Sequence, residues 1–385
     1  MQRFYFDHNA TTPVSPEVLE AMTPCLTEFY GNASSIHHFG QAAKQRLESA
    51  RRQVASLLGC GAREIVFVSG GTEADNLAVL GTARNCAKTA PHVITSAIEH
   101  PAVLHACRQL EREGASVTYV PAGADGLVDP GEIRRALRPA TVLISIMHAN
   151  NELGTVQPLA QIAEIAREAG VPLHSDGVQA AGKIPVDVNA LGVDLYSISG
   201  HKICAPKGIG ALYVRKGTKL GAVTFGGHHE RGRRAGTENV PGAVALGRAA
   251  EWAARSLDAE SVRLAELRDR LESALLERIP NAGVNGSRSA RTPNTANIYF
   301  DFLEGEALVI ALDLKGFAVS SGAACSSGAV EPSHVLTAIG LAPERARASI
   351  RFSLGRANTA EQVDALIEAV ATSVAHLRKL SPAHA

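Results

Sequence analysis

Polar side chains that could do chemistry follow five of the apolar runs in this 385-residue chain. Each of the following positions comes soon after a run with the composition of a buried strand: Gly71 with Thr72, His100, Asn151, Asp176 and Lys202. Taken singly, each has an ordinary structural explanation, such as a helix cap, a turn or a solvated lysine. Ligands of an open parallel sheet, however, bind beyond the carboxyl ends of its strands. Five such groups at one edge therefore predict a ligand site.

The residue types at this edge match the needs of pyridoxal phosphate, which uses a lysine, a carboxylate, phosphate donors and a flat group on the ring. Asp176 can keep the ring nitrogen protonated, so that the ring acts as an electron sink. Lys202 can form the imine and carry the α-proton, because burial readily lowers a lysine pKa. His100 can stack on the ring and exchange protons near neutral pH. Gln179 can hydrogen-bond the ring oxygen.

Glycines and a hydroxyl at Gly70-Gly71-Thr72 open a helical pattern, where free N–H groups and the helix dipole favour a phosphate. An ordinary N-cap turn is the alternative explanation. Two other glycine motifs do not predict nucleotide binding. The segment from Gly177 to Lys183 nearly matches a P-loop, but Ile184 stands where the Mg²⁺-binding Ser or Thr is needed. Gly208-Ile209-Gly210 lacks the third glycine of a dinucleotide fingerprint and precedes a strand.

Cys325 differs from the other five cysteines because small residues surround it from Ser320 to Ala329, which predicts a mobile, exposed loop. A free cysteine is usually a buried small hydrophobe, and that explanation suits Cys25, Cys86 and Cys107. A nearby cation would raise the thiolate fraction of Cys325, and His100 or the C-terminal arginines could supply it. Of those arginines, Arg351 lies in a strand before a turn and could hold a substrate carboxylate in two hydrogen bonds. For Arg356 a surface ion pair is the competing explanation.

The elements that position these residues alternate between strands and helices, which is typical of a parallel sheet covered by helices. Seven strands are expected, at 64–69, 92–96, 116–120, 142–147, 171–174, 195–199 and 211–214. A helix over about 244–278 is expected to lead into short strands at 296–300, 318–320 and 349–353. We therefore predict an α/β fold with a large cofactor-binding domain over residues 16–255. A smaller α+β domain is expected to comprise residues 1–15 and 256–385 and to carry the Cys325 loop.

The overall composition narrows the possible partners and surroundings. Lys plus Arg and Asp plus Glu both total 38, so no basic excess exists to attract nucleic acid or an anionic membrane. No apolar stretch is long enough to cross a bilayer, and the N-terminus lacks the apolar core of a signal peptide. The six cysteines are scattered without a C-x-x-C pair, which disfavours a metal site or a disulfide framework. A reducing, cytoplasmic setting and small-molecule or protein partners are expected.

With these residues in place, the chain resembles the cysteine desulfurases of the NifS/IscS type, a class V aminotransferase-like group within the fold-type I pyridoxal-phosphate enzymes. The resemblance runs nearly end to end and rests on these motifs: 6–12, 31–37, 69–73, 99–101, 150–152, 174–176, 199–202, 233–239 and 321–325. The segments 228–234 and 377–382 look closer to the nitrogen-fixation NifS branch than to housekeeping IscS. Gly71 departs from housekeeping members, which often carry another small residue there.

The resemblance implies a role for each matching residue. Lys202 would be the Schiff-base lysine, Asp176 the partner of the ring nitrogen, and His100 a stacking and catalytic group. Cys325 would accept sulfur from L-cysteine and carry it as a persulfide to an iron–sulfur scaffold protein. The remaining implied contacts are the ring oxygen for Gln179, the phosphate for Gly71, Thr72, Ser199 and His201, and the substrate carboxylate for Asn151 and Arg351. Thr237 would reach the phosphate in the neighbouring subunit, which implies a homodimer with shared active sites.

Three alternatives remain open from the sequence. The chain could serve general iron–sulfur assembly rather than nitrogenase maturation. It could be another fold-type I enzyme, such as a selenocysteine lyase or a small aminotransferase, which would share Lys202 and Asp176 but not need Cys325. It could also be a persulfide-carrying or scaffold-binding protein that has kept the fold without the catalysis.

Overall fold

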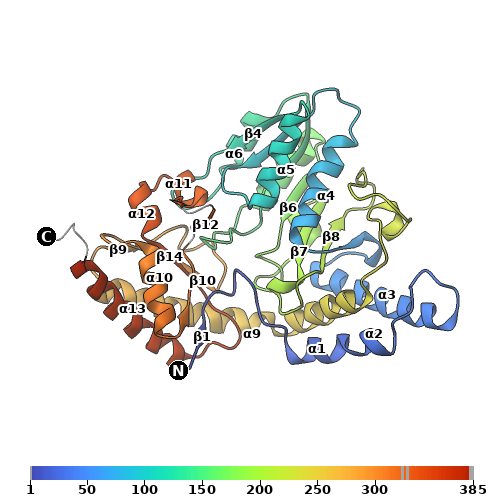
Figure 1. Ribbon diagram of the computed structural model, residues 1–385. Coiled ribbons are helices and arrows are strands. Elements are labelled where there is room, and N and C mark those ends of the chain that lie inside the picture. The colour runs from blue at the N-terminus through green and yellow to red at the C-terminus, as the bar shows by residue number, and fades with distance from the viewer. Residues whose placement is uncertain (1, 322–324, 327–328, 381–385) are drawn as a thin grey trace.

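A computed structural model describes residues 2–321, 325–326 and 329–380 of the chain (Figure 1). Its centre is a seven-stranded sheet in the order β2-β8-β7-β6-β5-β3-β4. The strands in that order are Ile65–Val68, Gly210–Val214, Leu195–Ser199, Leu173–Asp176, Thr141–Ser145, His92–Ser96 and Ser116–Val120. Only β8 runs antiparallel to its neighbours within this sheet. The predicted mainly parallel sheet is therefore confirmed.

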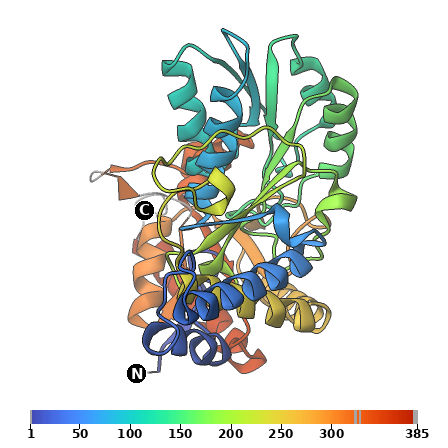
Figure 2. The same cartoon turned by 90° about the vertical axis from the view of Figure 1, so that its right-hand side faces the viewer.

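Helices cover both faces of this sheet, as the turned view shows (Figure 2). One face packs against α4 (Gly71–Arg84) and α5 (Pro101–Arg112). The other packs against α3 (His38–Leu58), α6 (Pro130–Ala136), α7 (Leu159–Ala169), α8 (Val188–Leu191) and the first part of α9 (Val240–Arg278). In β2, Ile65 and Phe67 face the second layer while Val66 and Val68 face the first. This alternation explains why the strand reads as a continuous apolar run: both of its faces are buried.

Local sequence signals set where several of these helices begin and end. His100 caps α5, because its Nδ1 accepts a hydrogen bond from the Ala102 N–H at 3.1 Å and Pro101 occupies the first helical position. Ser15 caps α1 (Pro16–Met22) in the same way, and α2 (Pro24–Thr27) follows it directly. At the other end of α3, Gly59 adopts a left-handed conformation that closes the helix.

A second hydrophobic cluster gathers Phe6 with residues between 264 and 374. Its three-stranded antiparallel sheet has the order β14-β10-β9, formed by Ser349–Ser353, Thr295–Phe300 and Ala282–Val284. Short pairs join β1 (Phe4–Tyr5) to β11 (Phe317–Ala318) and β12 (Cys325–Ser326) to β13 (Ala329–Val330). The accompanying helices are α10 (Gly305–Leu314), α11 (His334–Ala338), α12 (Pro343–Arg347) and α13 (Ala360–Leu380). The proposed domain bounds at residues 15/16 and 255/256 stay a prediction.

Three predicted strands differ from the observed ones by more than one residue at an end, while 64–69, 211–214 and 296–300 differ by a single residue at one or both ends. The expected strand 171–174 is β6, Leu173–Asp176, so Asp176 ends the strand instead of following it. The shift has a local cause, because Gly170 closes α7 in a left-handed conformation and residues 171–172 complete that turn. The expected strand 142–147 is observed as Thr141–Ser145. The expected strand 318–320 is β11, Phe317–Ala318, whereas Ser320 makes only an isolated bridge with Arg351.

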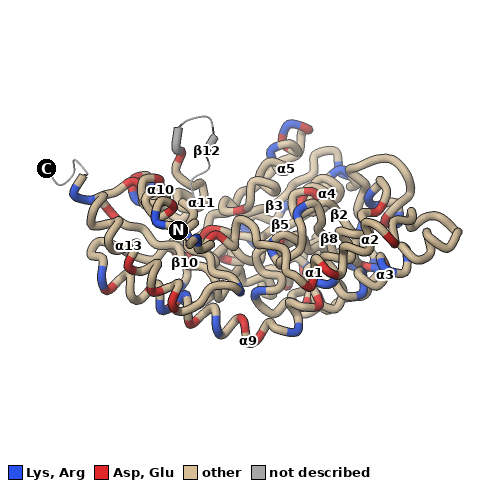
Figure 3. Tube along the Cα trace, turned by 60° about the horizontal axis from the view of Figure 1, so that its bottom comes forward, with Lys and Arg blue, Asp and Glu red and all other residues tan. Residues whose placement is uncertain are grey.

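Acidic and basic residues alternate along the chain trace, with both signs along α9 (Figure 3). Among the described residues, no helix is long and apolar enough to cross a membrane.

Short one-turn helices complete the framework around the sheet. They are η1 (Ala62–Glu64), η2 (Gly200–Lys202) and η3 (Glu230–Gly232). Of these, η2 continues directly from the end of β7 and therefore places Lys202 at the carboxyl edge of the sheet.

Candidate active site

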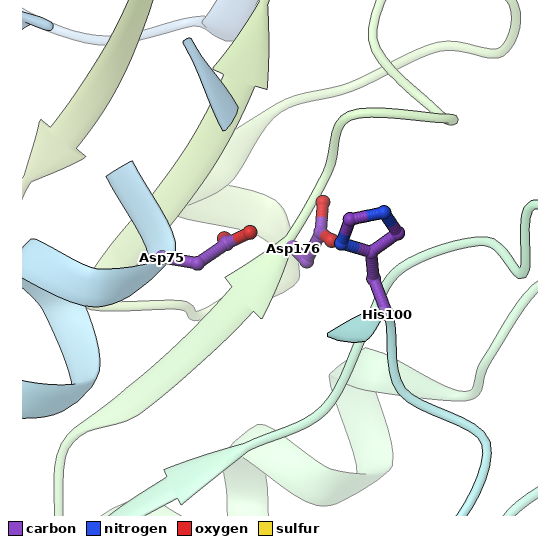
Figure 4. A group of neighbouring side chains, drawn as sticks. All are labelled: Asp75, His100 and Asp176. Carbon is purple, nitrogen blue, oxygen red and sulfur yellow. The ribbon is translucent and has the colours of Figure 1, made fainter. Parts of the chain in front are cut away.

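The carboxyl ends of β3, β6 and β7 bring the central predicted residues to one edge of the sheet. Asp176 ends β6, Lys202 ends η2 just after β7, and His100 begins α5 beyond β3. Figure 4 shows Asp176 between His100 and a third side chain, Asp75 of α4. A carboxylate oxygen of Asp75, a ring nitrogen of His100 and a carboxylate oxygen of Asp176 all lie within 4.8 Å of one another. Spacing along the sequence did not predict the presence of Asp75.

Asp176 is buried, and the neighbouring His100 and Lys202 act on its carboxyl group. Its Oδ1 accepts a hydrogen bond from the Val178 N–H at 2.9 Å. Burial raises the pKa of Asp176, whereas His100 and Lys202 lower it. Burial and the neighbouring Asp176 charge raise the pKa of Asp75 well above its ordinary value. Asp75 is thus the member of this carboxyl pair that keeps a proton, and Asp176 is the one available to face a cationic ring nitrogen.

Glycine is required directly after Asp176. A Cβ at Gly177 would lie 2.0 Å from the ring of Tyr196, so no other residue allows β6 to end against this buried tyrosine. The tight fit fixes the position from which the Asp176 carboxylate projects.

His100 is held as a neutral imidazole. Its Nδ1 accepts the hydrogen bond from Ala102, which leaves the proton on Nε2. Burial lowers the pKa of His100, and Lys202 lowers it further, while Asp176 raises it. The ring is therefore a flat, uncharged group beside Asp176 that can donate at Nε2.

Lys202 is placed to react as a free amine. Burial, followed by the Arg351 charge, lowers the pKa of Lys202 to about 8. Its Nζ donates hydrogen bonds to the carbonyl oxygens of Asn9 at 2.5 Å and Ala10 at 2.7 Å. The N-terminal segment thus holds the amine at the sheet edge, and close to neutral pH a sizeable fraction is unprotonated and nucleophilic.

The N-terminus of α4 forms a cradle opposite this amine. Gly71 begins the helix, and a Cβ at Gly71 would lie 2.8 Å from Val178 Cγ2 and 3.5 Å from Ser199 Cβ. The backbone of Gly71 therefore lies close to both the loop after Asp176 and the end of β7. The first N–H groups of a helix have no intrahelical acceptor and bind anions well. Gly71, Thr72 and Ser199 are thus brought together as predicted, although their contact with a phosphate stays a prediction.

His201 contacts the N-terminal segment, and Thr237 lies on a segment anchored to α4. His201 Nδ1 contacts Thr11 Oγ1 at 3.1 Å, and burial followed by the Lys202 charge lowers its pKa to about 4. Thr237 is exposed on the segment before α9. That segment is tied to α4 by the ion pair between Arg234 and Glu73 at 2.8 Å.

Arg351 and Asn151 meet through the backbone. Arg351 donates from one terminal nitrogen to the Asn151 carbonyl at 3.0 Å and from the other to Asp7 Oδ1 at 2.7 Å. Its Nε is buried and has no hydrogen-bond partner among the described residues. A buried unpaired N–H is costly, so this guanidinium has unused capacity for a carboxylate. Arg356 is positioned differently, with its guanidinium 3.5 Å from the ring centroid of Trp252.

The sulfur-accepting position lies outside the described side chains. The backbone of Cys325 belongs to β12, but its side chain and residues 322–324 and 327–328 are not described. Among the other cysteines, Cys25 and Cys107 are buried, as predicted, whereas Cys86 is partly exposed, contrary to expectation. Cys86 lies beyond the end of α4 and lines a surface pocket, which explains why it is only partly buried.

Four residues around the site were missed by the sequence reasoning. Asp75 and Glu99 are buried carboxyls behind Asp176 and His100, and burial raises the pKa of Glu99 to about 8. Asn9 and Lys183 contact Gln179, which the sequence reasoning did single out. Asn9 was noted only as part of a motif, and Lys183 only as part of a rejected P-loop. For Asp75, Glu99 and Lys183, the available signal was a charged residue within four positions of an expected ligand residue in the sequence.

The residues present suit pyridoxal phosphate. The edge offers an amine with a lowered pKa in Lys202, a carboxylate in Asp176, a flat neutral ring in His100 and an anion-binding helix N-terminus at Gly71. The unpaired Nε of Arg351 adds a site for a carboxylate. Together these groups meet each requirement that the cofactor places on a protein.

Comparison with known proteins agrees with this geometry. Residues 4–366 match the family model described as aminotransferase class-V. "Cysteine desulfurase IscS" of Methanosarcina thermophila is 50% identical over 378 residues, which cover 98% of this chain and 93% of the relative. "Cysteine desulfurase 1" of Trichormus variabilis is 50% identical over 382 residues, covering 99% and 95%. A solved structure titled as a NifS-like protein has a TM-score of 0.92 at 37% identity, covering 98% of this chain and 100% of that one.

A full-length match at this level, together with the site at the sheet edge, places the chain in the aminotransferase class-V family. Its fold is that of the fold-type I pyridoxal-phosphate enzymes. Within the family it is a pyridoxal-phosphate-dependent enzyme of the cysteine desulfurase group. The predicted family, fold class, enzyme class and cofactor are confirmed, and the alternative of a non-catalytic carrier is set aside.

Proposed function

We propose that this enzyme removes sulfur from L-cysteine and leaves L-alanine and a persulfide on Cys325. The observation that carries the proposal is the pairing of a low-pKa amine, Lys202, with an incompletely paired arginine, Arg351, whose charge lowers the pKa of that amine. An amine and a carboxylate-binding group at one edge suit an amino acid substrate. Relatives named cysteine desulfurase support the choice of cysteine.

The chain's own residues have distinct roles in this proposal. When bound, the cofactor supplies an electron sink for the substrate carbon that loses its proton. Arg351 and Asn151 orient the substrate carboxylate, and Lys202 Nζ accepts the α-proton because its amine is partly unprotonated near neutral pH. Asp176 keeps its charge toward the ring nitrogen, and His100 covers the ring. Gly71, Thr72, Ser199 and His201 hold the phosphate, and Gln179 contacts the ring oxygen.

The sulfur transfer itself conserves atoms and electrons. The Cys325 thiolate forms a bond to the substrate sulfur while the carbon–sulfur bond of the substrate breaks. The electron pair of the broken bond stays on the carbon, which takes up a proton, and L-alanine leaves. The persulfide sulfur is then passed to an acceptor protein.

A homodimer is also part of the proposal, and exposed apolar side chains support it. Ile36 is 93% exposed, Phe225 86% and Tyr30 66%. The two segments that carry them are adjacent, because Ser34 Oγ lies 3.4 Å from His229 Nδ1. A second copy of the chain would bury this surface and bring the exposed Thr237 near the partner's phosphate cradle.

Mixing two inactive variants tests the shared site. Lys202→Ala and Thr237→Val homodimers should each lose activity. Heterodimers formed by mixing them should regain up to about half of the parent rate per dimer, because one of the two sites then has both residues and the other has neither. Absence of recovery in verified heterodimers would place Thr237 in its own subunit's site.

We propose that the physiological sulfur acceptor is an iron–sulfur scaffold protein that serves nitrogenase maturation. General iron–sulfur assembly is the alternative role. The segments 228–234 and 377–382 support the nitrogenase role, whereas relatives named IscS support general iron–sulfur assembly. A reducing cytoplasmic setting suits an enzyme with a reactive thiol, and the five described cysteines are all free. The rate of iron–sulfur cluster formation is measured on a purified scaffold of each kind, with the enzyme limiting. The scaffold that is loaded faster identifies the role.

The proposed chemistry is tested with Cys325→Ala. We expect the holoenzyme to form sulfide and alanine from L-cysteine in the presence of a thiol, and the variant to lose this activity while keeping the visible absorption of its cofactor. Cys86→Ala, a partly exposed cysteine outside the site, is the matched control. Full sulfide release by Cys325→Ala would refute the persulfide route. Activity on L-selenocysteine that does not depend on Cys325 would instead favour a selenocysteine lyase.

A further inference from the structure

Gln179 is held by two partners whose hydrogen-bonding chemistry cannot be exchanged. Its Oε1 accepts a hydrogen bond from Lys183 Nζ at 2.5 Å, and its Nε2 donates to the Asn9 carbonyl at 3.0 Å. Burial, followed by the Lys202 and Arg351 charges, lowers the pKa of Lys183 well below its ordinary value. Charged or neutral, its amine has the protons to donate to both Gln179 and Asn9, and a backbone carbonyl can only accept. Turning the amide over would place its oxygen against the carbonyl oxygen of Asn9, which is repulsive, and would remove the bond that Lys183 donates to Gln179.

From this geometry we infer that Lys183 is a positioning residue, which fixes the amide of Gln179 so that an N–H faces the cofactor's ring oxygen. The inference rests on the proposed contact between Gln179 and that oxygen. An amide that presented its oxygen there would repel an anionic ring oxygen, whereas an N–H stabilises it. Lys183 itself does not touch the cofactor in this arrangement.

Asn9 extends the same arrangement to the other side chains of the site. Its Oδ1 accepts from Lys183 Nζ at 2.9 Å, and its backbone carbonyl accepts from both Gln179 and Lys202. Its Nδ2 donates to the Asn151 carbonyl at 3.1 Å. Asn9 is 2% exposed, so these bonds are shielded from water. Lys183 therefore also steadies the residue that holds Lys202.

A neighbouring cavity makes the role of Lys183 testable by substitution. A cavity of about 340 Å³ is lined by Lys183 and Lys202 together with Cys204, Trp252 and Arg356. A larger donor such as an arginine at position 183 has room to extend into this space. Lys183→Met removes the hydrogen-bond donor and nearly keeps the length of the side chain. Lys183→Arg keeps N–H donors, and a guanidinium cannot accept a hydrogen bond.

The decisive measurement is the pH midpoint of the visible absorption change of the purified holoenzyme, recorded without substrate. If the ring oxygen loses its fixed donor, its proton is held more tightly and the midpoint rises. For one hydrogen bond we expect Lys183→Met to raise the midpoint by about 0.5 to 1 pH unit. Lys183→Arg should restore the parent midpoint. Lys219→Met, the same change at an exposed lysine, should leave it unchanged.

A double-mutant cycle with Gln179→Leu separates positioning from a direct effect of charge. If Lys183 acts through Gln179, Lys183→Met shifts the midpoint in the parent but not in the Gln179→Leu protein. Equal shifts in both backgrounds, or no shift in the parent, overturn the inference. A failure of the proposed function is distinguishable: if Gln179→Leu alone leaves the midpoint unchanged, the proposed ring-oxygen contact is wrong. The persulfide chemistry is assessed separately, by the Cys325→Ala assay.

Discussion

Replacing Arg351 by methionine provides the sharpest test of how the substrate is bound. The guanidinium carries five N–H donors, and the structure assigns one from each terminal nitrogen to Asn151 and Asp7. Its buried Nε–H is unpaired among the described residues. The side chain can therefore give a carboxylate two parallel hydrogen bonds without breaking either existing one.

The size of the effect follows from this count. Hydrogen bonds to charged groups contribute about 1.5 kcal/mol or more each, so two of them contribute about 3 kcal/mol. At 1.36 kcal/mol for each factor of ten, Arg351→Met should lower kcat/KM for L-cysteine about 150-fold. Most of the loss should appear as a higher KM, because the carboxylate is held in the bound substrate and in the transition state alike. The Asp7 carboxylate, left without its partner, adds repulsion.

Steady-state alanine formation over a wide range of cysteine concentrations measures this loss. Arg356→Met is the matched control, because Arg356 stacks on Trp252 and is the other arginine of the segment; it should change kcat/KM no more than about threefold. Arg351→Lys keeps one charge without the fork and should lose about tenfold. A loss below fivefold for Arg351→Met, or an equal loss for Arg356→Met, would refute the assignment.

Three further predictions concern protonation and stability. The rate at which added cofactor reacts with cofactor-free protein should rise with pH through a midpoint near 8, because Lys202 reacts as the free amine; a midpoint above 10 would contradict this. The pKa of Glu99 is raised to about 8, so the unfolded chain releases that proton first and stability falls as pH rises from about 4.5 to 8. Glu99→Gln should remove this fall in urea unfolding measured across that range, and an unchanged pH profile would contradict it. Glu230→Ala removes two 2.7 Å contacts from the buried Arg51, which then keeps only the more exposed Glu48 at 3.1 Å as an ionic partner. This change should cost about 3 kcal/mol of unfolding free energy; a loss under about 1 kcal/mol would contradict it.

Much of the sheet could be predicted because most of its strands are buried on both faces, although the edge strand β4 is only partly buried. The runs 92–96, 116–120 and 195–199 coincide with β3, β4 and β7, whose apolar or β-branched composition marks them clearly. The strand ending at Asp176 was displaced by two residues, because its polar second half, His174-Ser175-Asp176, does not look like a strand. In the fold the His174 ring is satisfied by neighbouring strands, because it contacts Ser145 Oγ at 2.8 Å and Ser197 Oγ at 3.0 Å. The Ser175 hydroxyl, by contrast, is buried without a partner among the described residues.

The residues that would touch the cofactor were easier to predict than the residues that support them. Lys202 and Asp176 follow or end strands, and the rule for parallel sheets is enough to locate them. Asn9 and Lys183 act through partners far away in sequence, since the contact between Asn9 and Lys183 spans 174 positions. No periodicity or local motif encodes such a pair. Their assignment needs the three-dimensional positions of side chains.

The N-terminal segment explains why the site involves both the large sheet and the smaller three-stranded sheet. Asp7 pairs with Arg351 of β14, and the Asn9 N–H bonds to Ser353 at 2.9 Å. The carbonyls of Asn9 and Ala10 hold Lys202, which ends η2 just beyond β7 of the large sheet. One short segment thus connects the amine at the edge of the large sheet to the arginine of the smaller one. Substrate binding would involve both Lys202 and Arg351. The distance between this amine and this carboxylate-binding group is therefore set by the N-terminal segment and not by either sheet alone.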